Sequence, residues 1–444
     1  MNLVLNKTGV GVFIMNVLTV EARTKKKTMR RILPYILLLY IICHIDRINI
    51  GFAALEMNAE LALSAEVFGL LSGIFFIGYF LFEVPSNMMM NKVGAKFWIA
   101  RIMITWGILV ILTGFVQSAM HLYILRFLLG VAEAGFLPGI LLFITHWFRE
   151  RDRSKATATL FLAIPIATLI GAPVSTWIMD TIYWFEWAGW RWMFVLEGIP
   201  AILLGIVTFF FLTNKPSDAK WLKDDEQQWL NAEIAKEQQL SASLNPVKIS
   251  KMLFNLTLWK LSWLYFAGYT GLIGLSFWIP TIIKSLTLDV TTNLEIGWLA
   301  IIPPVIGIPA ILVTGWNTDR IGKHKIHLII CQLIAAVGFV GCALVTSLIP
   351  MIIMLSIAAG GLYGTTGCFY SYLTFFFTKV TAPIGIAFVN SLASLGGFFG
   401  PVILGYFTLT IGMYILGALM ISASLFMLTM RPSSRDVAMQ NHII

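Results

Sequence analysis

Charge is scarce in this sequence of 444 residues: Asp, Glu, Lys and Arg make up 12% of it, whereas 58% is hydrophobic. A water-soluble domain carries about 25% charged residues. Apolar runs recur along the chain, and about 20 residues of apolar helix cross a bilayer. The composition therefore excludes a single soluble domain and predicts an all-α membrane protein.

Cysteine is also scarce, and motifs of enzymes are missing. The four cysteines lie in apolar segments without the spacing of disulfides or of a metal site. The sequence shows no Ser/His/Asp spacing, nucleotide-binding loop or His/Cys cluster. We therefore expect no enzyme, no metal and no cofactor. We attribute the net charge of +9 to membrane topology and expect no binding of nucleic acid.

Twelve apolar runs are long enough to span a bilayer, and the polar segment 214–258 divides them six and six. The expected spans are roughly 31–53, 67–90, 97–117, 120–146, 156–182, 190–213, 259–284, 296–317, 326–346, 350–378, 384–408 and 410–430. The chain then consists of a cytoplasmic tail (1–30), a six-helix bundle (31–213), a cytoplasmic linker with a surface helix (214–258), a second six-helix bundle (259–430) and a cytoplasmic tail (431–444).

Positive charge is distributed unevenly along this pattern. If both termini are cytoplasmic, all but five of the 31 Lys and Arg residues lie in the tails and the cytoplasmic loops. The opposite loops carry acidic residues instead, such as Glu56 and Glu186. Because Lys and Arg collect in cytoplasmic loops, we expect a multi-pass protein of the cell membrane with both termini inside.

The second half repeats the scaffold of the first at a shift of 228 residues. The shift places Lys92-Val-Gly94 on Arg320-Ile-Gly322 and Gly171-Ala-Pro173 on Phe399-Gly-Pro401. Two pseudo-symmetric bundles with a site at the midplane are a known transporter architecture. The charges, however, do not repeat. Five membrane-depth charges of the first half align with neutral residues of the second: they are Asp46, Arg47, Glu83, Arg126 and Glu133.

One motif of the second half, Gly315-Trp-Asn-Thr-Asp319-Arg320-Ile-Gly322, resembles the signature of the major facilitator superfamily. That signature lies between the second and third helices of each half, and we expect a tight cytoplasmic turn there. Three further segments resemble the anion:cation symporter family: Ile45-Asp46-Arg47-Ile-Asn49, Arg126-Phe-Leu-Leu-Gly130-Val-Ala-Glu133, and Asn390-Ser-Leu-Ala-Ser-Leu-Gly396. The resemblance to permeases for tartrate, phthalate, rhamnonate or hydroxyphenylacetate implies proton-driven uptake of an organic carboxylate.

Arg47 and Arg126 are the candidates for binding a carboxylate. An arginine at membrane depth is costly unless it is paired or hydrated, and its guanidinium holds a carboxylate bidentately. Asp46 and Glu133 are the candidates for carrying the coupled proton, since a carboxylate that loses its cationic partner to the substrate gains affinity for a proton. The alternative is a permanent structural ion pair of Arg47 with Asp46 or Glu133, or of Arg126 with Glu133 two turns away.

Three further side chains of the first half, Tyr79, Glu83 and His44, are candidates for the site or its support. Tyr79 is a candidate hydrogen-bond donor to the substrate, whereas we interpret Glu83 as a structural partner of backbone groups freed by Pro85. His44, where sugar-acid members of the family have a tyrosine, is either a titrating group or a core residue.

Asn390 matches the binding asparagine of the family, and Tyr370 is either a site or a packing residue. Ile164-Pro165 replaces a glutamine of the sugar-acid members, which argues against a long polyhydroxy acid.

The sequence thus predicts a monomeric secondary transporter that alternates access and takes up a small organic acid with protons. The acid is a hydroxy-dicarboxylate, an aromatic acid or a sugar acid. An exchanger or exporter with the same site is the first alternative. A transporter-like nutrient sensor is the second, although the short segment after Met430 offers no output module.

Overall fold

The computed structural model describes residues 5–242, 255–287, 291–376 and 382–430, and these residues contain helices and no strand. Twelve helical segments are long and apolar enough to cross a membrane, as the sequence predicts. The segments of the first half are α1 (Leu5–Glu60), α2 (Ala65–Val93), α3 (Ala95–Thr113), α4 (Ala119–Glu133) with α5 (Phe136–Trp147), α6 (Glu150–Phe161) with α7 (Ala163–Thr181), and α8 (Gly189–Phe211). Those of the second half are α11 (Leu256–Leu286), α12 (Asn293–Ala300) with α13 (Ile302–Ile321), α14 (His324–Leu344), α15 (Leu348–Thr374), α16 (Ala382–Tyr406) and α17 (Leu409–Leu428).

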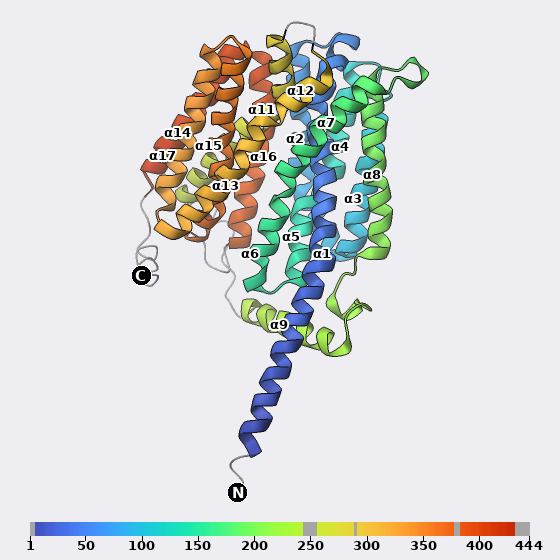
Figure 1. Cartoon of the computed structure of the whole chain (residues 1–444), viewed down its shortest axis with the longest axis vertical. Helices are drawn as coiled ribbons and strands as arrows, with labels where there is room; N and C mark the ends of the chain where they lie inside the picture. The colour runs from blue at the N-terminus through green and yellow to red at the C-terminus, as the bar shows by residue number, and fades with distance from the viewer. Residues whose placement is uncertain (1–4, 243–254, 288–290, 377–381, 431–444) are drawn as a thin grey trace.

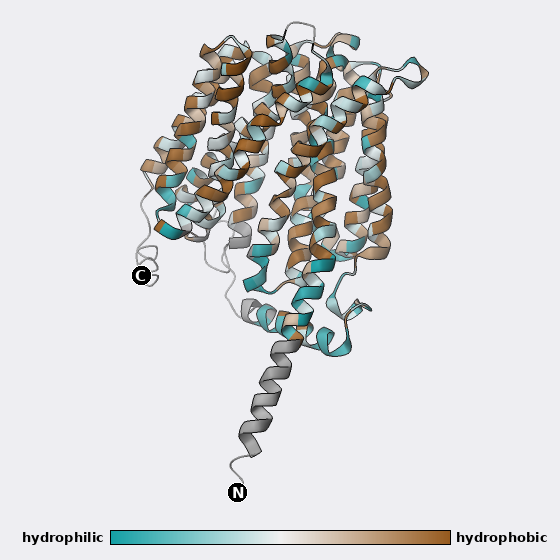
Figure 2. Cartoon of the chain, in the orientation of Figure 1, coloured by the Kyte–Doolittle hydropathy of each residue, from teal (hydrophilic) through white to brown (hydrophobic). Residues whose placement is uncertain are grey.

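The helices form two bundles that lie side by side, one from each half of the chain (Figure 1). Helix α9 (Asp224–Ala242) lies across α1 at one end, which we call the α9 end. The short helix η1 (Trp184–Glu186) and α12 lie at the opposite end, the η1 end. Figure 2 shows the apolar surface along the spans and polar segments at α9 and the first turns of α6. This pattern is that of a polytopic membrane protein.

Three of the expected spans are broken in two, which the apolar pattern did not predict. The fourth span breaks after Glu133, where Gly135 adopts a left-handed conformation with φ of 83°. The fifth breaks at Leu162 and the eighth at Ile301, just before prolines that provide no N–H for a continuous helix. Interrupted helices place backbone and side chains in the interior of a transporter, where they line its site.

Helix α1 differs from the expected tail of residues 1–30, because it begins at Leu5 and continues through Pro34 into the first span. The hydroxyl groups of Thr24 and Thr28 bond to carbonyls one turn earlier, which lets these polar residues remain helical. The first turns of α1 project beyond the bundle at the α9 end (Figure 1). Residues 1–4, residues 243–254 of the expected linker and the expected tail 431–444 lie outside the described residues.

The two bundles are in close contact toward the η1 end. A Cβ atom on Gly69 of α2 would lie 2.6 Å from the carbonyl oxygen of Pro401 in α16, and one on Gly73 would lie 2.8 Å from that of Phe398. Only glycine permits this contact between backbones, which closes the interface between the bundles here. Asp180 adds a polar contact, because its carboxylate accepts hydrogen bonds from the backbone N–H of Leu294 and the amide of Asn293 at the start of α12.

Candidate substrate and proton site

Arg47 of α1 and Glu133 form an ion pair in which the side chains are 11% and 3% exposed. Cys43 lies one turn before Arg47, and its thiol donates a hydrogen bond of 3.2 Å to the same carboxylate. Glu133 is only 3% exposed, and it is the last residue of α4 because the chain turns at Gly135. Of the partners that the sequence left open for Arg47, the structure therefore selects Glu133.

Arg126 lies two turns before Glu133 on α4 and is 1% exposed. The Phe75 ring separates the two arginines, with its centroid 5.3 Å from Cζ of Arg47 and 5.4 Å from Cζ of Arg126. Within the described part of the chain, Nε and Nη2 of Arg126 have no hydrogen-bond partner. Glu133 pairs with Arg47 and only its charge acts on Arg126, so these three residues together carry a net positive charge and N–H donors without a partner in the described structure.

Aromatic side chains from both bundles enclose Arg47. Tyr79, on α2, lies with its ring centroid 5.5 Å from Cζ of Arg47. Tyr269 of α11 interacts with the same guanidinium from the second bundle, and its ring lies 6.2 Å from that of Phe76. Sequence reasoning missed Tyr269, since a neutral aromatic in an apolar span carries no signal of its own. Arg47 therefore contacts both bundles.

Asp46 faces away from this pair although it is adjacent to Arg47 in sequence. One of its oxygens accepts a 2.7 Å hydrogen bond from the indole N–H of Trp106 on α3, and the other has no partner among the described residues. Consecutive residues on a helix point about 100° apart, so α1 presents Arg47 to α4 and Asp46 to α3. The two predicted proton carriers, Asp46 and Glu133, thus lie on different sides of α1.

A further buried carboxylate, Glu197 of α8, lies on the Asp46 side of α1. Its two oxygens accept hydrogen bonds from Asn49 at 3.1 Å and Ser175 at 2.5 Å. Glu197 is 7% exposed, and its charge acts on Asp46. Sequence reasoning missed it, although an acidic residue eight positions inside a predicted span was a usable signal.

The second bundle contributes a chain of neutral hydroxyl and amide groups. The hydroxyl of Tyr370 on α15 donates to Oδ1 of Asn390 on α16 at 3.1 Å and lies 3.0 Å from the hydroxyl of Tyr265. Its ring stacks on Phe161 of the first bundle with centroids 5.7 Å apart. The structure thus brings together Tyr370 and Asn390, which the sequence proposed separately, and adds Tyr265.

In the described structure, the hydrogen bonds of Glu83 and His44 are not with Arg47, Arg126 or Glu133. The Glu83 carboxylate accepts a 3.1 Å hydrogen bond from Ser391 of α16, so it joins the bundles to each other. We had expected it to bond to the backbone near Pro85. His44 lies with Nδ1 3.3 Å from the carbonyl of Tyr40, one turn back on α1, and its ring packs edge-on against that tyrosine. These contacts are those of a core histidine.

The signature segment forms the end of α13 and the turn after it. Gly322 ends the helix in a left-handed conformation with φ of 70°, and its N–H bonds to the carbonyl of Thr318. Gly315 lies within α13, where a Cβ would be 3.8 Å from the carbonyl oxygen of Gly367 in α15. Arg320 packs on Trp316, and the side chain of Asp319 lies outside the described residues. The expected tight turn is therefore confined to Gly322, and the rest of the motif is helical.

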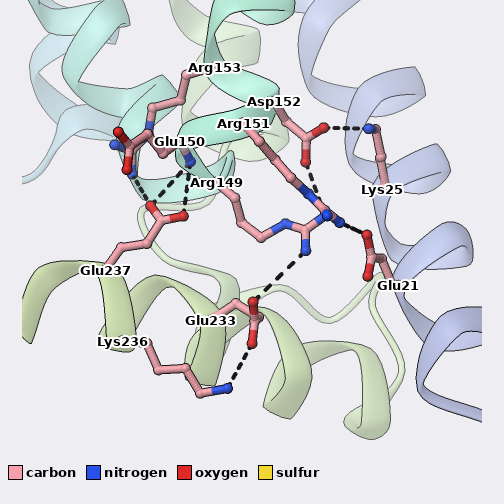
Figure 3. Close-up of polar contacts among 10 residues, drawn as sticks. All are labelled: Glu21, Lys25, Arg149, Glu150, Arg151, Asp152, Arg153, Glu233, Lys236 and Glu237. Carbon is pink, nitrogen blue, oxygen red and sulfur yellow. Dashed lines mark hydrogen bonds and ion pairs between the residues drawn. The ribbon is translucent and has the colours of Figure 1, made fainter. Parts of the chain in front are cut away.

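Charged residues also gather at the α9 end, where α1, α6 and α9 meet (Figure 3). Arg149, at the start of α6, lies 2.8 Å from Glu21 of α1 and 3.9 Å from Glu233 of α9. Arg153 lies 2.9 Å from Glu237 of α9, and Lys25 pairs with Asp152. We call this network of ion pairs the clasp. It fastens the described part of the linker to the first bundle.

The fold has twelve candidate membrane spans in two bundles and a buried, charged cluster. This is the architecture of a secondary transporter in a membrane. Comparison with known families agrees. The chain matches the Major Facilitator Superfamily over residues 36–294 and 282–441, and it belongs to that family. Its members are transporters and not enzymes.

Named relatives support this assignment along most of the chain. A protein of Agrobacterium vitis named "Putative tartrate transporter" is 42% identical, covering 94% of this chain and 93% of its own length. A "Quinolone resistance transporter" of Acinetobacter baumannii is 35% identical, covering 88% and 91%. The xylose transporter XylE from E. coli, in a partially occluded inward open conformation, superimposes with a TM-score of 0.73 at 16% identity, covering 92% and 99%. At this identity the last comparison establishes the fold alone.

Proposed function

We propose that the protein is a symporter that takes up a small organic carboxylate together with protons. The observation that carries this proposal is the surplus positive charge at Arg126, whose buried Nε and Nη2 have no partner in the described structure. A buried guanidinium without an anion is strongly unfavourable, so the site favours binding of a negative ligand. A carboxylate satisfies both the charge and the paired N–H donors.

The substrate class follows from the number and kind of groups around the cluster. Two guanidiniums flank the Phe75 ring, which suits an acid with a second carboxylate or a hydroxyl group. Tyr269, Tyr370 and Asn390 offer neutral hydrogen-bonding groups from the second bundle. A relative named for tartrate, a short hydroxy-dicarboxylate, is consistent with these groups. Ile164-Pro165 offers no side-chain amide for a longer sugar acid.

Coupling follows from competition for Arg47. In the substrate-free site Glu133 holds Arg47, and an entering carboxylate takes over part of that guanidinium. Glu133 then lies in a low-dielectric site with a weakened cationic partner, and it binds a proton more readily. Substrate and proton therefore bind together. The proton gradient is the driving force and no cofactor takes part.

Transport requires the site to open alternately to each side. The bundles, residues 31–213 and 259–430, rock around the cluster. The positive charge at the α9 end supports the proposal that this end and both termini are cytoplasmic. The closed contacts at the η1 end then separate the site from the outside. We propose a monomer in the cell membrane as the working unit.

The test is uptake of labelled L-tartrate by purified protein in lipid vesicles with an imposed proton gradient. We expect accumulation that a protonophore abolishes and a sodium gradient does not replace. Accumulation driven by sodium, or uptake only into vesicles preloaded with counter-substrate, would refute proton symport and favour the alternative of an exchanger. Gradient-driven efflux alone would favour an exporter.

Glu133→Gln tests the coupling step within the same assay. The neutral amide mimics a protonated Glu133, so we expect the variant to exchange tartrate across the membrane but not to accumulate it against a gradient. Glu60→Gln, which removes an acidic partner of Arg191 at the η1 end, is the matched control and should accumulate normally. If Glu133→Gln loses exchange as well while its thermal unfolding is unchanged, Glu133 is a structural partner of Arg47 only.

A further inference from the structure

Glu197 of α8 is a buried acid that the proposed coupling through Arg47 and Glu133 does not use. It is 7% exposed, and its hydrogen-bond donors are the neutral side chains of Asn49 and Ser175. Glu133, by comparison, has Arg47 as a cationic partner. A single ionised carboxylate can be held in the interior by hydrogen bonds such as these, but a second carboxylate beside it, with no cation, makes ionisation of both strongly unfavourable.

Asp46 lies on the same side of α1 as Glu197 and, among the described residues, also has no cationic partner. Asn49 follows Asp46 by three residues, so the same face of α1 carries both, and Asn49 contacts Glu197 directly. Asp46 is 3% exposed and receives one hydrogen bond, from the indole of Trp106, while its Oδ1 has no partner within the described residues. The two carboxylates thus share one small buried region.

Among the described residues, the groups that contact the pair carry no positive charge. From α3 the group facing Asp46 is the Trp106 indole, and from α7 the group facing Glu197 is the Ser175 hydroxyl. The charged groups that act on Asp46 are Glu197 and Glu133, both acidic, and Arg47 is directed to Glu133 on the other side of α1. Two neighbouring carboxylates without a cation cannot both remain ionised, and one proton between them relieves their repulsion.

We propose that Asp46 and Glu197 hold one proton between them and that Glu197 is therefore a proton-binding residue of this transporter. The bound proton sits on one carboxyl group and neutralises it, while the other remains a carboxylate stabilised by Trp106 or by Asn49 and Ser175. The role in coupling rests on the proposed proton symport, whereas the shared proton itself does not. The pair titrates as a unit, separately from Glu133.

Infrared difference spectroscopy of the purified, full-length protein tests the shared proton without any substrate. We expect the wild type to show the carbonyl stretch of a protonated carboxyl group at neutral pH, shifted in D2O. Asp46→Asn and Glu197→Gln should each abolish the same band, because the remaining single carboxylate ionises when the repulsion is gone. The double variant should lose no more intensity in this band than either single variant does.

The geometry allows Glu197→Gln to fold. The amide is isosteric with the carboxyl group, and the unpartnered Oδ1 of Asn49 is available to accept a hydrogen bond from it. Glu60→Gln is the matched control, since Glu60 and Arg191 pair between the same two helices, α1 and α8, and its removal should leave the band unchanged. Glu197→Asp, which retains the acid, should keep a protonated-carboxyl band and serves as the second variant.

Transport adds a separate readout. Glu197→Gln should lose accumulation of labelled L-tartrate under a proton gradient, keep exchange, and exchange at a rate that depends less on pH than the rate of the wild type does. An unchanged infrared band in Glu197→Gln, or separate bands lost additively by the two variants, would overturn the shared proton. Failure of the wild type to accumulate tartrate would instead overturn the proposed function, and the infrared result would still decide the pair.

Discussion

At the scale of single residues, the partner of a buried charge indicates its role better than its depth does. Glu133, Asp46 and Glu197 are all nearly inaccessible, yet only Glu133 has an arginine partner. Arg126 is more deeply buried than Arg47, and two of its nitrogens lack a partner in the described structure. Arg126, Asp46 and Glu197 have no ion-pair partner in the described structure, and a buried charge of this kind is costly until it binds a counter-ion or, for a carboxylate, a proton.

Arg126→Gln separates binding from stability. We expect the affinity for tartrate to fall by about 2–5 kcal/mol, the range for truncating one partner of a buried charge pair. The substrate-free protein should unfold at a higher temperature, because an uncompensated buried charge is removed. Isothermal titration and thermal unfolding of the purified protein measure the two effects.

Arg101→Gln is the control for this prediction. Arg101 also lies in a span, on α3, but it packs on the ring of Trp98 at 3.9 Å and is remote from the Arg47 cluster. Its removal should leave tartrate affinity unchanged. If Arg126→Gln binds tartrate as tightly as the wild type, Arg126 is not part of the substrate site and the surplus charge has another role.

At the scale of elements, the sequence predicted the spans but not their interruptions or the contacts of side chains. Hydropathy finds an apolar stretch, and it cannot distinguish a straight helix from one broken at Gly135 or at Ile301. The helical extension of α1 was missed for a different reason. Its stability comes from contacts with α6 and α9, which are distant in sequence (Figure 3).

The clasp suggests that α9 is a structural part of the first bundle. Glu226 of α9 accepts hydrogen bonds from Arg23 at 2.6 Å, Lys27 at 2.7 Å and the N–H of Lys223 at 2.9 Å. Burial alone raises the pKa of this carboxyl group, but these donors outweigh burial and lower its pKa below the usual value. Such a group stabilises the folded state above its unfolded pKa, and that contribution is lost as pH falls through the folded pKa.

Glu226→Gln should therefore release α9 from α1. The change leaves Arg23 and Lys27 without this carboxylate, and we expect the docking of α9 to weaken by roughly 1–3 kcal/mol. Hydrogen exchange of the α9 backbone in the purified protein measures this, with Lys236→Gln as a control, since Lys236 pairs only within α9 in the described contacts. In the wild type α9 should remain protected at neutral pH and be released only on acidification below the ordinary range of a glutamate. Equal exchange in Glu226→Gln and the wild type would contradict this role.

At the scale of the whole molecule, the scaffold is symmetric and the chemistry is not. The 228-residue repeat predicted that the charges belong to the first bundle, and the structure places Arg47, Arg126 and Glu133 together there. The second bundle contributes the neutral groups of Tyr269, Tyr370 and Asn390. The sequence could predict the charged residues because a charge in an apolar span is conspicuous. It could not predict the role of Tyr269, because the contact of Tyr269 with Arg47 depends on how the two bundles pack against each other.

The uneven distribution of Lys and Arg between the two ends predicts the orientation in the membrane, which cysteine labelling tests. The four native cysteines are all buried, so a new exposed thiol is labelled against a low background. Phe185 in η1 is 83% exposed, and Gln228 of α9 is exposed at the opposite end. Because Lys and Arg gather at the α9 end, that end should be cytoplasmic. In right-side-out membrane vesicles a membrane-impermeant maleimide should therefore label Phe185→Cys at once and Gln228→Cys only after the vesicles are opened. The reverse order would place the α9 end outside, and uptake along the proposed direction would then be export.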